Sequence, residues 1–115
     1  MGELGCMRCY ADCGRKKIIV DPGCRLSYQR HHYRSERWIV VEGVASVIKD
    51  GVSATLKYGE SVELPSMCLH RLMNETDAIL IVIEVQYGSL LSEHDIERID
   101  DDYFRCIPVG KHAEQ

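Results

Sequence analysis

The stretch QRHHYRSERWIVVEG, residues 29–43, decides the fold. It begins with Gln29 and His31, which are two positions apart and therefore share one face of an extended strand. His32 points to the opposite face, so strand geometry separates the two adjacent histidines. After a polar segment a new strand begins near Glu36, and a hairpin at this point would bring Glu36 back beside Gln29 and His31. The stretch therefore offers three candidate ligands on one face.

A second stretch, GESVELPSMCLHRLMN at residues 59–74, follows the first after fifteen positions. It contains Gly59, Pro65, His70 and Asn74 at fixed spacings. His70 opens a further short strand-like run, HRLM. A lone histidine in a strand is usually structural or exposed, because histidine serves many roles. Together with the first stretch, however, His70 becomes a candidate fourth ligand.

The two patterns, Q-x-H-x4-E-x6-G and G-x5-P-x4-H-x3-N, resemble the two motifs of the cupin superfamily, with glutamine in place of the first histidine. The resemblance implies an all-β fold, a double-stranded β-helix or jelly-roll barrel, in which both motifs bring ligands to one metal ion. The implied metal ligands are Gln29, His31, Glu36 and His70. Such a set suits zinc, which we favour, and also manganese, iron, cobalt or nickel.

A closer resemblance extends over residues 17–105. The segments VDPGCRLSYQRHHYRSERWIVVEGVASV, LPSMCLHRLMN and IEVQYGSLLSEHDIERIDDDY are similar to the C-terminal cupin domain of type II mannose-6-phosphate isomerases. In that family the domain usually follows a mannose-1-phosphate guanylyltransferase domain. Membership implies interconversion of mannose 6-phosphate and fructose 6-phosphate, an aldose-ketose isomerisation through an enediol. The implied partner is thus a small sugar phosphate.

This reaction needs a base to move a proton between C1 and C2, and cations to hold the phosphate. The sequence leaves two candidate bases open, Glu84 and His32. Glu84 shares a strand face with Gln86, and a carboxylate inside a barrel has a raised pKa that suits proton transfer. The candidate substrate-binding residues are Arg34, Tyr33, Arg71 and Gln86. Arg34 is the first choice among them, whereas Arg30 alternates with the ligands and should face away.

The sequence departs from the family pattern at three positions. Tyr33 replaces the third histidine of the first motif, and Arg37 replaces the histidine before tryptophan. Met67 replaces the glycine of P-x-G, which could remove a turn with positive φ. These changes keep an alternative function open. In that alternative the chain is a noncatalytic metal-containing cupin that binds a sugar or sugar phosphate, or an accessory subunit in sugar-nucleotide or polysaccharide biosynthesis.

The composition fits one soluble domain. The chain has 115 residues, of which 45% are hydrophobic, and a net charge of -4. This length supports one core, and the negative charge argues against a general nucleic-acid binder. No apolar run approaches the roughly 18 residues that cross a bilayer, and the start lacks the apolar core of a signal peptide. We therefore expect a cytoplasmic protein without membrane or nucleic-acid partners.

Six cysteines occur, three of them in the first fifteen residues. Cys6 and Cys9 have the spacing of half a zinc or iron-sulfur site, to which Cys13 could add a third thiolate, but no second C-x-x-C completes it. Without an export signal, free thiols are expected rather than a disulfide framework. We predict a Cys-rich N-terminal tail over residues 1–16, a cupin domain over 17–107 and a C-terminal tail over 108–115.

Short strand-like runs separated by turn residues dominate the chain, which favours a barrel or sandwich. Asp50-Gly51 between two of these runs predicts a type I′ hairpin. The segment SEHDIERIDDDYF, residues 92–104, predicts one short C-terminal helix, with Ser92 as its N-cap. An open β-edge needs protection, so we also expect a homodimer.

Overall fold

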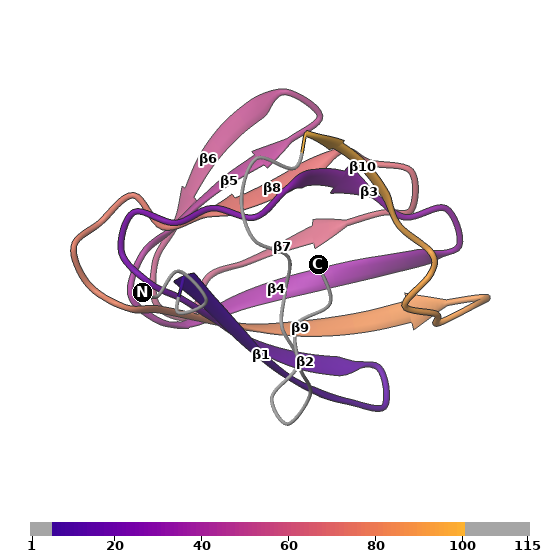
Figure 1. Cartoon of the computed structure of the whole chain (residues 1–115), viewed down its shortest axis with the longest axis horizontal. Coiled ribbons are helices and arrows are strands. Elements are labelled where there is room, and N and C mark those ends of the chain that lie inside the picture. Colours follow the sequence, from indigo (N-terminus) through magenta and orange to yellow (C-terminus); the bar gives the residue numbers. More distant parts are fainter. Residues whose placement is uncertain (1–5, 101–115) are drawn as a thin grey trace.

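The computed structural model describes residues 6–100 and contains two five-stranded antiparallel sheets. The first sheet consists, in spatial order, of β1 (Met7–Asp12), β2 (Arg15–Val20), β9 (Leu80–Gly88), β4 (Arg34–Glu42) and β7 (Ser61–Leu64). The second consists of β10 (Glu97–Asp100), β3 (Tyr28–Arg30), β8 (His70–Met73), β5 (Ala45–Lys49) and β6 (Val52–Leu56). In Figure 1 the second sheet lies above most of the first. The expected all-β jelly roll is confirmed.

The inner face of the first sheet is apolar at one end and polar at the other. On β4 every second side chain from Arg34 to Val40 is buried, as the alternation of a strand requires. The neighbouring strand β9 buries Leu80 and Val82 beside the apolar end and Glu84 beside the polar end. The apolar end packs into the core, where it meets Val47 of β5 among other residues. The same two strands therefore provide both the core and the wall of a site.

The predicted hairpin at Asp50-Gly51 is confirmed. Asp50 has a φ of 49° and Gly51 a φ of 83°, which are the two positive values that a type I′ turn requires. Lys49 and Val52 pair directly across this two-residue loop. The Asp50 carboxylate also accepts a hydrogen bond from the backbone N–H of Leu69, at 2.9 Å, and so ties the turn to the segment before His70.

Two motif residues have structural roles. Gly43 has a φ of +85°, and a side chain at this position would collide with the backbone carbonyl of Ile79. Asn74 is buried, and its amide donates to the carbonyl oxygens of Val20 and Ala78 at 2.9 and 2.7 Å. These contacts hold the loop before β9 against the end of β2, so the motif glycine and asparagine maintain the barrel.

The N-terminal boundary lies earlier than we predicted. Residues 7–12 form β1, which pairs along its whole length with β2, and β2 pairs with β9 from Arg15 onward. Residues 7–16 are therefore part of the first sheet instead of a tail. The strand character of residues 7–12 is weak in the sequence, because the buried side chains of this segment, Met7 and Cys9, are not β-branched. The predicted C-terminal tail at 108–115 lies outside the described residues.

The expectation of free thiols is wrong for Cys6 and Cys24, which form a disulfide across 18 positions, and for Cys9, which is also disulfide-bonded. The Cys6–Cys24 bond joins the start of β1 to the loop that follows β2. The backbone reinforces the connection, because the N–H of Asp21 donates to the carbonyl of Cys6 at 2.8 Å. Cys13 is free and exposed, and Cys68 is free and buried. The arrangement is not the metal half-site that the C-x-x-C spacing suggested, since Cys6 is oxidised.

Removal of this disulfide should destabilise the domain. Closing a loop of about this length restricts the unfolded chain, which contributes about 3 kcal/mol to the free energy of unfolding. We expect the variant Cys24→Ser to lower that free energy by about this amount in urea denaturation under oxidising conditions. The control is Cys13→Ser, because Cys13 is exposed and unbonded. Equal stability of the two variants would contradict a structural role for the bond.

The predicted C-terminal helix is wrong for the residues that the structure describes. The Ser92 hydroxyl does accept the backbone N–H of His94 at 3.1 Å, and the Ser92 carbonyl accepts the N–H of Asp95 at 3.1 Å, so the segment begins with a turn. The chain then extends into β10, where Glu97 and Arg98 pair with Arg30 and Gln29. Tertiary pairing overrides the local helical pattern here. Residues 101–104 of the predicted helix lie outside the described part.

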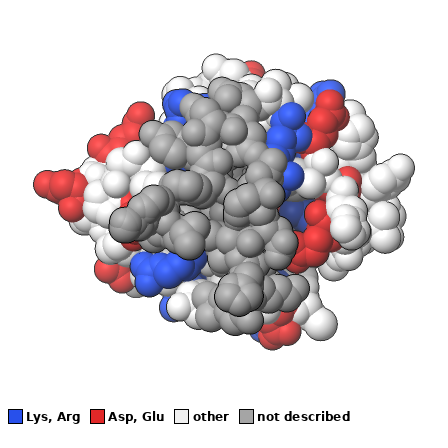
Figure 2. Space-filling view, viewed as in Figure 1, with Lys and Arg blue, Asp and Glu red and all other residues white. Residues whose placement is uncertain are grey.

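Within residues 6–100 no helical segment combines the length and the apolar character needed to cross a membrane. On the face shown in Figure 2, the visible acidic and basic side chains are interspersed around the rim instead of forming a patch of one sign. The edge strands are β1 and β7 in the first sheet and β10 and β6 in the second. The homodimer stays a prediction.

Candidate functional site

The segment between β3 and β4 carries the first motif, but it does not form the predicted hairpin. β3 belongs to the second sheet, where it pairs with β8 and β10, and β4 belongs to the first sheet. The connecting residues therefore cross from one sheet to the other. Asp95 holds this crossing in place, because its carboxylate accepts the backbone N–H groups of His32 and Tyr33 at 2.7 and 2.9 Å. The crossing nevertheless brings His31 to Glu36.

Three predicted ligands converge in the interior. His31, Glu36 and His70 are buried, and one potential ligand atom from each lies within 4.8 Å of the others. His31 Nε2 lies 3.0 Å from Glu36 Oε2, and His70 Nε2 lies 3.8 Å from Glu36 Oε1. In both histidines Nδ1 faces a backbone carbonyl, that of Asp95 for His31 at 2.6 Å and that of Cys68 for His70 at 3.1 Å. Such contacts orient Nε2 toward a metal in many histidine sites.

The cluster fits a divalent metal ion. Glu36 Oε1 and His70 Nε2 are fully buried, and no described residue forms a hydrogen bond with either atom. Burial lowers the pKa of His70 to about 4, although the charge of Glu36 opposes this shift, so the ring is neutral at pH 7. Burial alone would raise the pKa of Glu36, but its contact with His31 and the charge of Arg34 hold it well below its usual range. A neutral imidazole and an ionised carboxylate are the forms that ligate metals.

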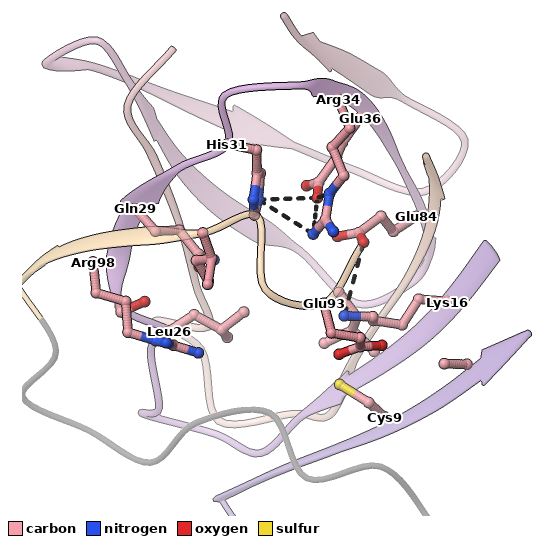
Figure 3. Close-up of a pocket in the computed structure, with 14 residues that line it drawn as sticks. Cys9, Lys16, Leu26, Gln29, His31, Arg34, Glu36, Glu84, Glu93 and Arg98 are labelled. Atoms are coloured by element: carbon pink, nitrogen blue, oxygen red, sulfur yellow. Dashed lines mark hydrogen bonds and ion pairs between the residues drawn. The ribbon is translucent and has the colours of Figure 1, made fainter. Parts of the chain in front are cut away.

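Gln29, the fourth predicted ligand, lies directly opposite His70 in the pairing of β3 with β8. It is half-buried and lines the cavity beside His31 (Figure 3). Its role as a ligand stays a prediction.

Arg34 is buried, and all three of its guanidinium nitrogens are engaged. Nε and Nη2 contact Glu36 Oε2 at 2.9 and 2.7 Å, and Nη1 donates to the Ser92 carbonyl at 3.1 Å. Nη2 also lies 3.4 Å from His31 Nε2. The sequence predicted a substrate contact at the barrel mouth. The structure instead places the guanidinium against the ligand cluster, where it balances the charge of Glu36 (Figure 3).

Glu84 is the candidate base that faces the cavity. Trp38 Nε1 donates to its Oε1 at 2.9 Å, and Gln86 Nε2 donates to its Oε2 at 2.7 Å. Burial raises the pKa of Glu84 and the negative charge of Glu36 adds to the rise, whereas Lys16 and the two donors oppose it. Gln86 therefore orients the carboxyl instead of facing the cavity beside the ligand cluster. Glu84 lines that cavity together with His31 and Glu36.

The other candidates lie elsewhere. His32 is exposed, and its Nε2 lies 2.9 Å from Glu97 on the outer side of β10. Tyr33 has 57% of its side chain exposed. Arg71 is buried, and its Nε donates to the Leu26 carbonyl at 2.8 Å. None of these three residues is among those that line the cavity with the ligand cluster. As expected, Arg30 faces away, bound to Glu97 at 3.0 Å.

Sequence reasoning missed three charged residues of this cavity. Lys16 of β2, Glu93 of the loop before β10 and Arg98 of β10 all line it (Figure 3). Lys16 was placed in the supposed tail, which hid its position opposite Glu84 in the pairing of β2 with β9. Arg98 was placed on the supposed helix. Recognition of the pairing of β2 with β9, and of β10 as a strand, would have found Lys16 and Arg98.

The turn that leads to His70 survives the replacement of glycine by Met67. Met67 has a φ of 74°, which is the left-handed region that favours glycine. Its backbone N–H donates to the carbonyl of His31 at 2.6 Å, so the turn connects the two motifs. The positive φ that the family pattern predicted is retained, at the cost of strain in a residue with a side chain.

Restoring glycine at this position should therefore stabilise the domain. A left-handed conformation costs a residue other than glycine about 1–2 kcal/mol, and the half-exposed Met67 side chain gives up little packing. Glycine also increases the conformational entropy of the unfolded chain, which offsets part of this gain. We therefore expect Met67→Gly to raise the free energy of unfolding by about 0.5–1 kcal/mol in chemical denaturation. Met67→Ala serves as the control, because it shortens the side chain and keeps the strain. An equal gain in both variants would contradict the conformational explanation.

Comparisons with known proteins agree with this geometry. The protein family described as "Mannose-6-phosphate isomerase C-terminal" matches residues 7–101. The chain is 49% identical over 90 residues to the alginate biosynthesis protein AlgA of Pseudomonas aeruginosa, covering 78% of the chain and 19% of that protein. It is 44% identical over 90 residues to the mannose-1-phosphate guanylyltransferase of Escherichia coli K12, with the same coverage. The chain thus spans about a fifth of the length of these relatives.

Solved structures show the same fold. A cupin 2 conserved barrel domain protein from Salinispora arenicola superimposes with a TM-score of 0.61 and 28% identity, over 65% of this chain and 62% of that one. The capsular polysaccharide assembling protein CapF from Staphylococcus aureus superimposes with a TM-score of 0.67 and 18% identity, over 75% and 28%. With the family matched over nearly the whole described region, the chain belongs to the mannose-6-phosphate isomerase C-terminal family and has a cupin fold.

Proposed function

We propose that this chain is a metal-dependent aldose-ketose isomerase that interconverts mannose 6-phosphate and fructose 6-phosphate. One observation carries the proposal. His31 and Glu36 of the buried cluster His31, Glu36 and His70 line the same cavity as the buried carboxyl of Glu84, and within residues 6–100 neither Glu36 Oε1 nor His70 Nε2 has a hydrogen-bond partner. A metal site beside a carboxyl of raised pKa is the combination that isomerisation through an enediol requires.

The proposed ligands are His31, Glu36 and His70, with Gln29 as the fourth, and zinc is the proposed metal. A divalent ion held there would act as a Lewis acid toward the substrate oxygens at C1 and C2. Arg34 keeps the Glu36 carboxylate in place through its two contacts, and the carbonyls of Asp95 and Cys68 keep both imidazoles oriented. The chain therefore prepares its ligand atoms before any ion binds.

Glu84 is the proposed base. In its ionised form it takes the proton from C2 of the aldose while O1 takes a proton from solvent water, which gives the enediol. The same carboxyl then returns the proton to C1 while O2 gives its proton to the hydroxide left by that water, which gives the ketose. Trp38 and Gln86 hold both oxygens of Glu84 and fix its orientation toward the cavity. The alternative base, His32, is directed to Glu97 on the surface, so the geometry favours Glu84.

The positions of Tyr33 and Arg37 support catalysis over the noncatalytic alternative. Both replace family histidines, which raised the question of a lost activity. Tyr33 is largely exposed, and Arg37 pairs with Glu63 on the outer surface at 3.0 Å. Neither residue lines the cavity. The two replacements therefore leave the proposed machinery unchanged.

The test is direct turnover. Purified protein is stripped with a chelator, reloaded separately with zinc, manganese, cobalt, nickel or iron, and incubated with mannose 6-phosphate. We expect fructose 6-phosphate to form with at least one metal. Its formation should stop when the chelator is added again. Failure of every metal to support turnover would reject the isomerase and leave the noncatalytic sugar-phosphate cupin.

A further inference from the structure

We propose that Lys16 is the anchor for the phosphate group of the substrate. This inference rests on the proposed function for the identity of the sugar, and it assigns a binding role to a residue outside both cupin motifs. Three long cationic side chains line the cavity, those of Lys16, Arg34 and Arg98. Their contacts decide which of them can receive an anion.

Arg34 is committed to other partners. Its guanidinium contacts Glu36, the Ser92 carbonyl and His31, and it is only 7% exposed. Binding a phosphate would require it to leave Glu36, which is a proposed metal ligand. The phosphate dianion must therefore bind to the other cationic residues of the cavity, Lys16 and Arg98. Arg34 then stays with the ligand cluster, and the phosphate lies on the side of the cavity away from that cluster.

Lys16 has the features of such an anchor. It lies on β2 directly opposite Glu84 of β9, and only 16% of its side chain is exposed. Its Nζ forms an ion pair with Glu84 Oε2 at 4.0 Å, a separation too long for a hydrogen bond, and no described residue accepts a hydrogen bond from it. The N–H groups of this largely buried ammonium therefore lack acceptors, which is costly, and a phosphate would supply acceptor oxygens together with further negative charge.

The position of Lys16 also suits the shape of a sugar phosphate. Figure 3 shows Lys16 and Arg98 on the side of the cavity away from His31 and Glu36, with Glu84 between Lys16 and the ligand cluster. A hexose 6-phosphate has its reacting carbons at one end and its phosphate at the other. When C1 and C2 of the sugar lie beside Glu84 and the ligand cluster, its phosphate group extends toward Lys16. Arg98, on the other side of the cavity from Lys16, adds positive potential for the phosphate.

The adjacent residue supplies a matched control. Lys17 lies on the same strand but points outward, where it is exposed and its Nζ lies 5.8 Å from the centre of the Tyr10 ring. The variants Lys16→Met and Lys17→Met remove the same charge one position apart. A general effect of net charge would weaken both, whereas an anchor affects Lys16 alone.

The experiment measures the binding of mannose 6-phosphate, mannose and inorganic phosphate to the metal-loaded protein by calorimetry, above the second pKa of the phosphate. We expect Lys16→Met to weaken mannose 6-phosphate binding by about 10- to 100-fold, as loss of a charge-assisted hydrogen bond does. Its affinity for mannose should be unchanged, Lys17→Met should bind as the wild type does, and Lys16→Arg should recover part of the loss. Melting temperatures confirm that each variant is folded.

Turnover separates an anchor from a residue that only positions Glu84. An anchor raises KM for mannose 6-phosphate with little change in kcat, whereas a positioning role lowers kcat and moves the pH profile. Undiminished binding by Lys16→Met, an equal loss in Lys17→Met, or a change in kcat alone would overturn the proposal. Binding that depends on Lys16 in a protein without turnover would support the anchor and reject the isomerase. A wild type that binds no mannose 6-phosphate would reject both.

Discussion

The His70→Ala variant is expected to lose stoichiometric metal and, with it, nearly all turnover. Within residues 6–100, His70 Nε2 has no hydrogen-bond partner, so its removal takes away a ligand and breaks no hydrogen bond of that nitrogen. Loss of a partner outside the ligand set already costs a metal site about 10- to 100-fold in affinity. We expect a ligand to cost at least about 100-fold, measured by metal analysis after dialysis and by competition with a chromogenic chelator.

Two further variants keep this prediction falsifiable. His70→Phe fills the space beside Trp38, against which the His70 ring packs edge-on at 5.3 Å, and it should lose metal while keeping the fold. His94→Ala is the histidine control, because His94 is exposed and lies outside both motifs. Undiminished metal content in folded His70→Phe would exclude His70 from the site. An equal loss in His94→Ala would point to a binding site elsewhere.

The Glu84→Gln variant should retain metal and lose the reaction. Glutamine keeps the shape of the side chain and cannot take the C2 proton, so kcat should fall by about 10²- to 10⁴-fold, the usual contribution of a positioned general base. Because burial raises the pKa of Glu84, the wild-type kcat/KM should decline as pH falls through a value above the ordinary 4.5 of a glutamate. The acidic limb appears because the base must be ionised. That limb should be absent from the residual activity of Glu84→Gln.

A carboxylate on the outer face provides the comparison. Glu63 is exposed, accepts the hydroxyl of Tyr87 and pairs with Arg37. Glu63→Gln should therefore leave kcat, KM and the pH profile unchanged. If Glu84→Gln turns over as fast as Glu63→Gln, Glu84 is not the base. Variation of His32, which faces Glu97, would then be the next test of the alternative.

The motif spacing predicted the ligand cluster because each ligand is fixed locally. His31 lies directly after β3, Glu36 lies on the inward face of β4 in the alternation that Trp38 and Val40 display, and His70 follows a turn that Met67 still forms. The hairpin between the first two ligands was wrong. Strand runs alone do not say which of two sheets a strand joins, and the Asp95 carboxylate that steers the crossing lies more than sixty positions away.

The sequence was least informative where long-range pairing decides the structure. Residues 92–100 carry a helical pattern, yet Glu97 and Arg98 pair with β3, and the Arg30-Glu97 ion pair stabilises that pairing. The first sixteen residues looked like a tail because β1 and the Cys6–Cys24 disulfide gain their partners only in the folded chain. Lys16 was missed for the same reason. Its neighbour Glu84 is 68 positions away, and only the pairing of β2 with β9 brings them together.

The most direct test of the central claim is an anomalous difference map from crystals of the metal-loaded protein, recorded at the absorption edge of the metal. The account predicts one strong peak about 2.0–2.3 Å from His31 Nε2, His70 Nε2 and a carboxylate oxygen of Glu36. The Gln29 amide should complete the set, and Arg34 should remain beside Glu36. A peak at Cys6, Cys9 or Cys13, or a metal bound elsewhere while this cluster stays empty, would contradict it.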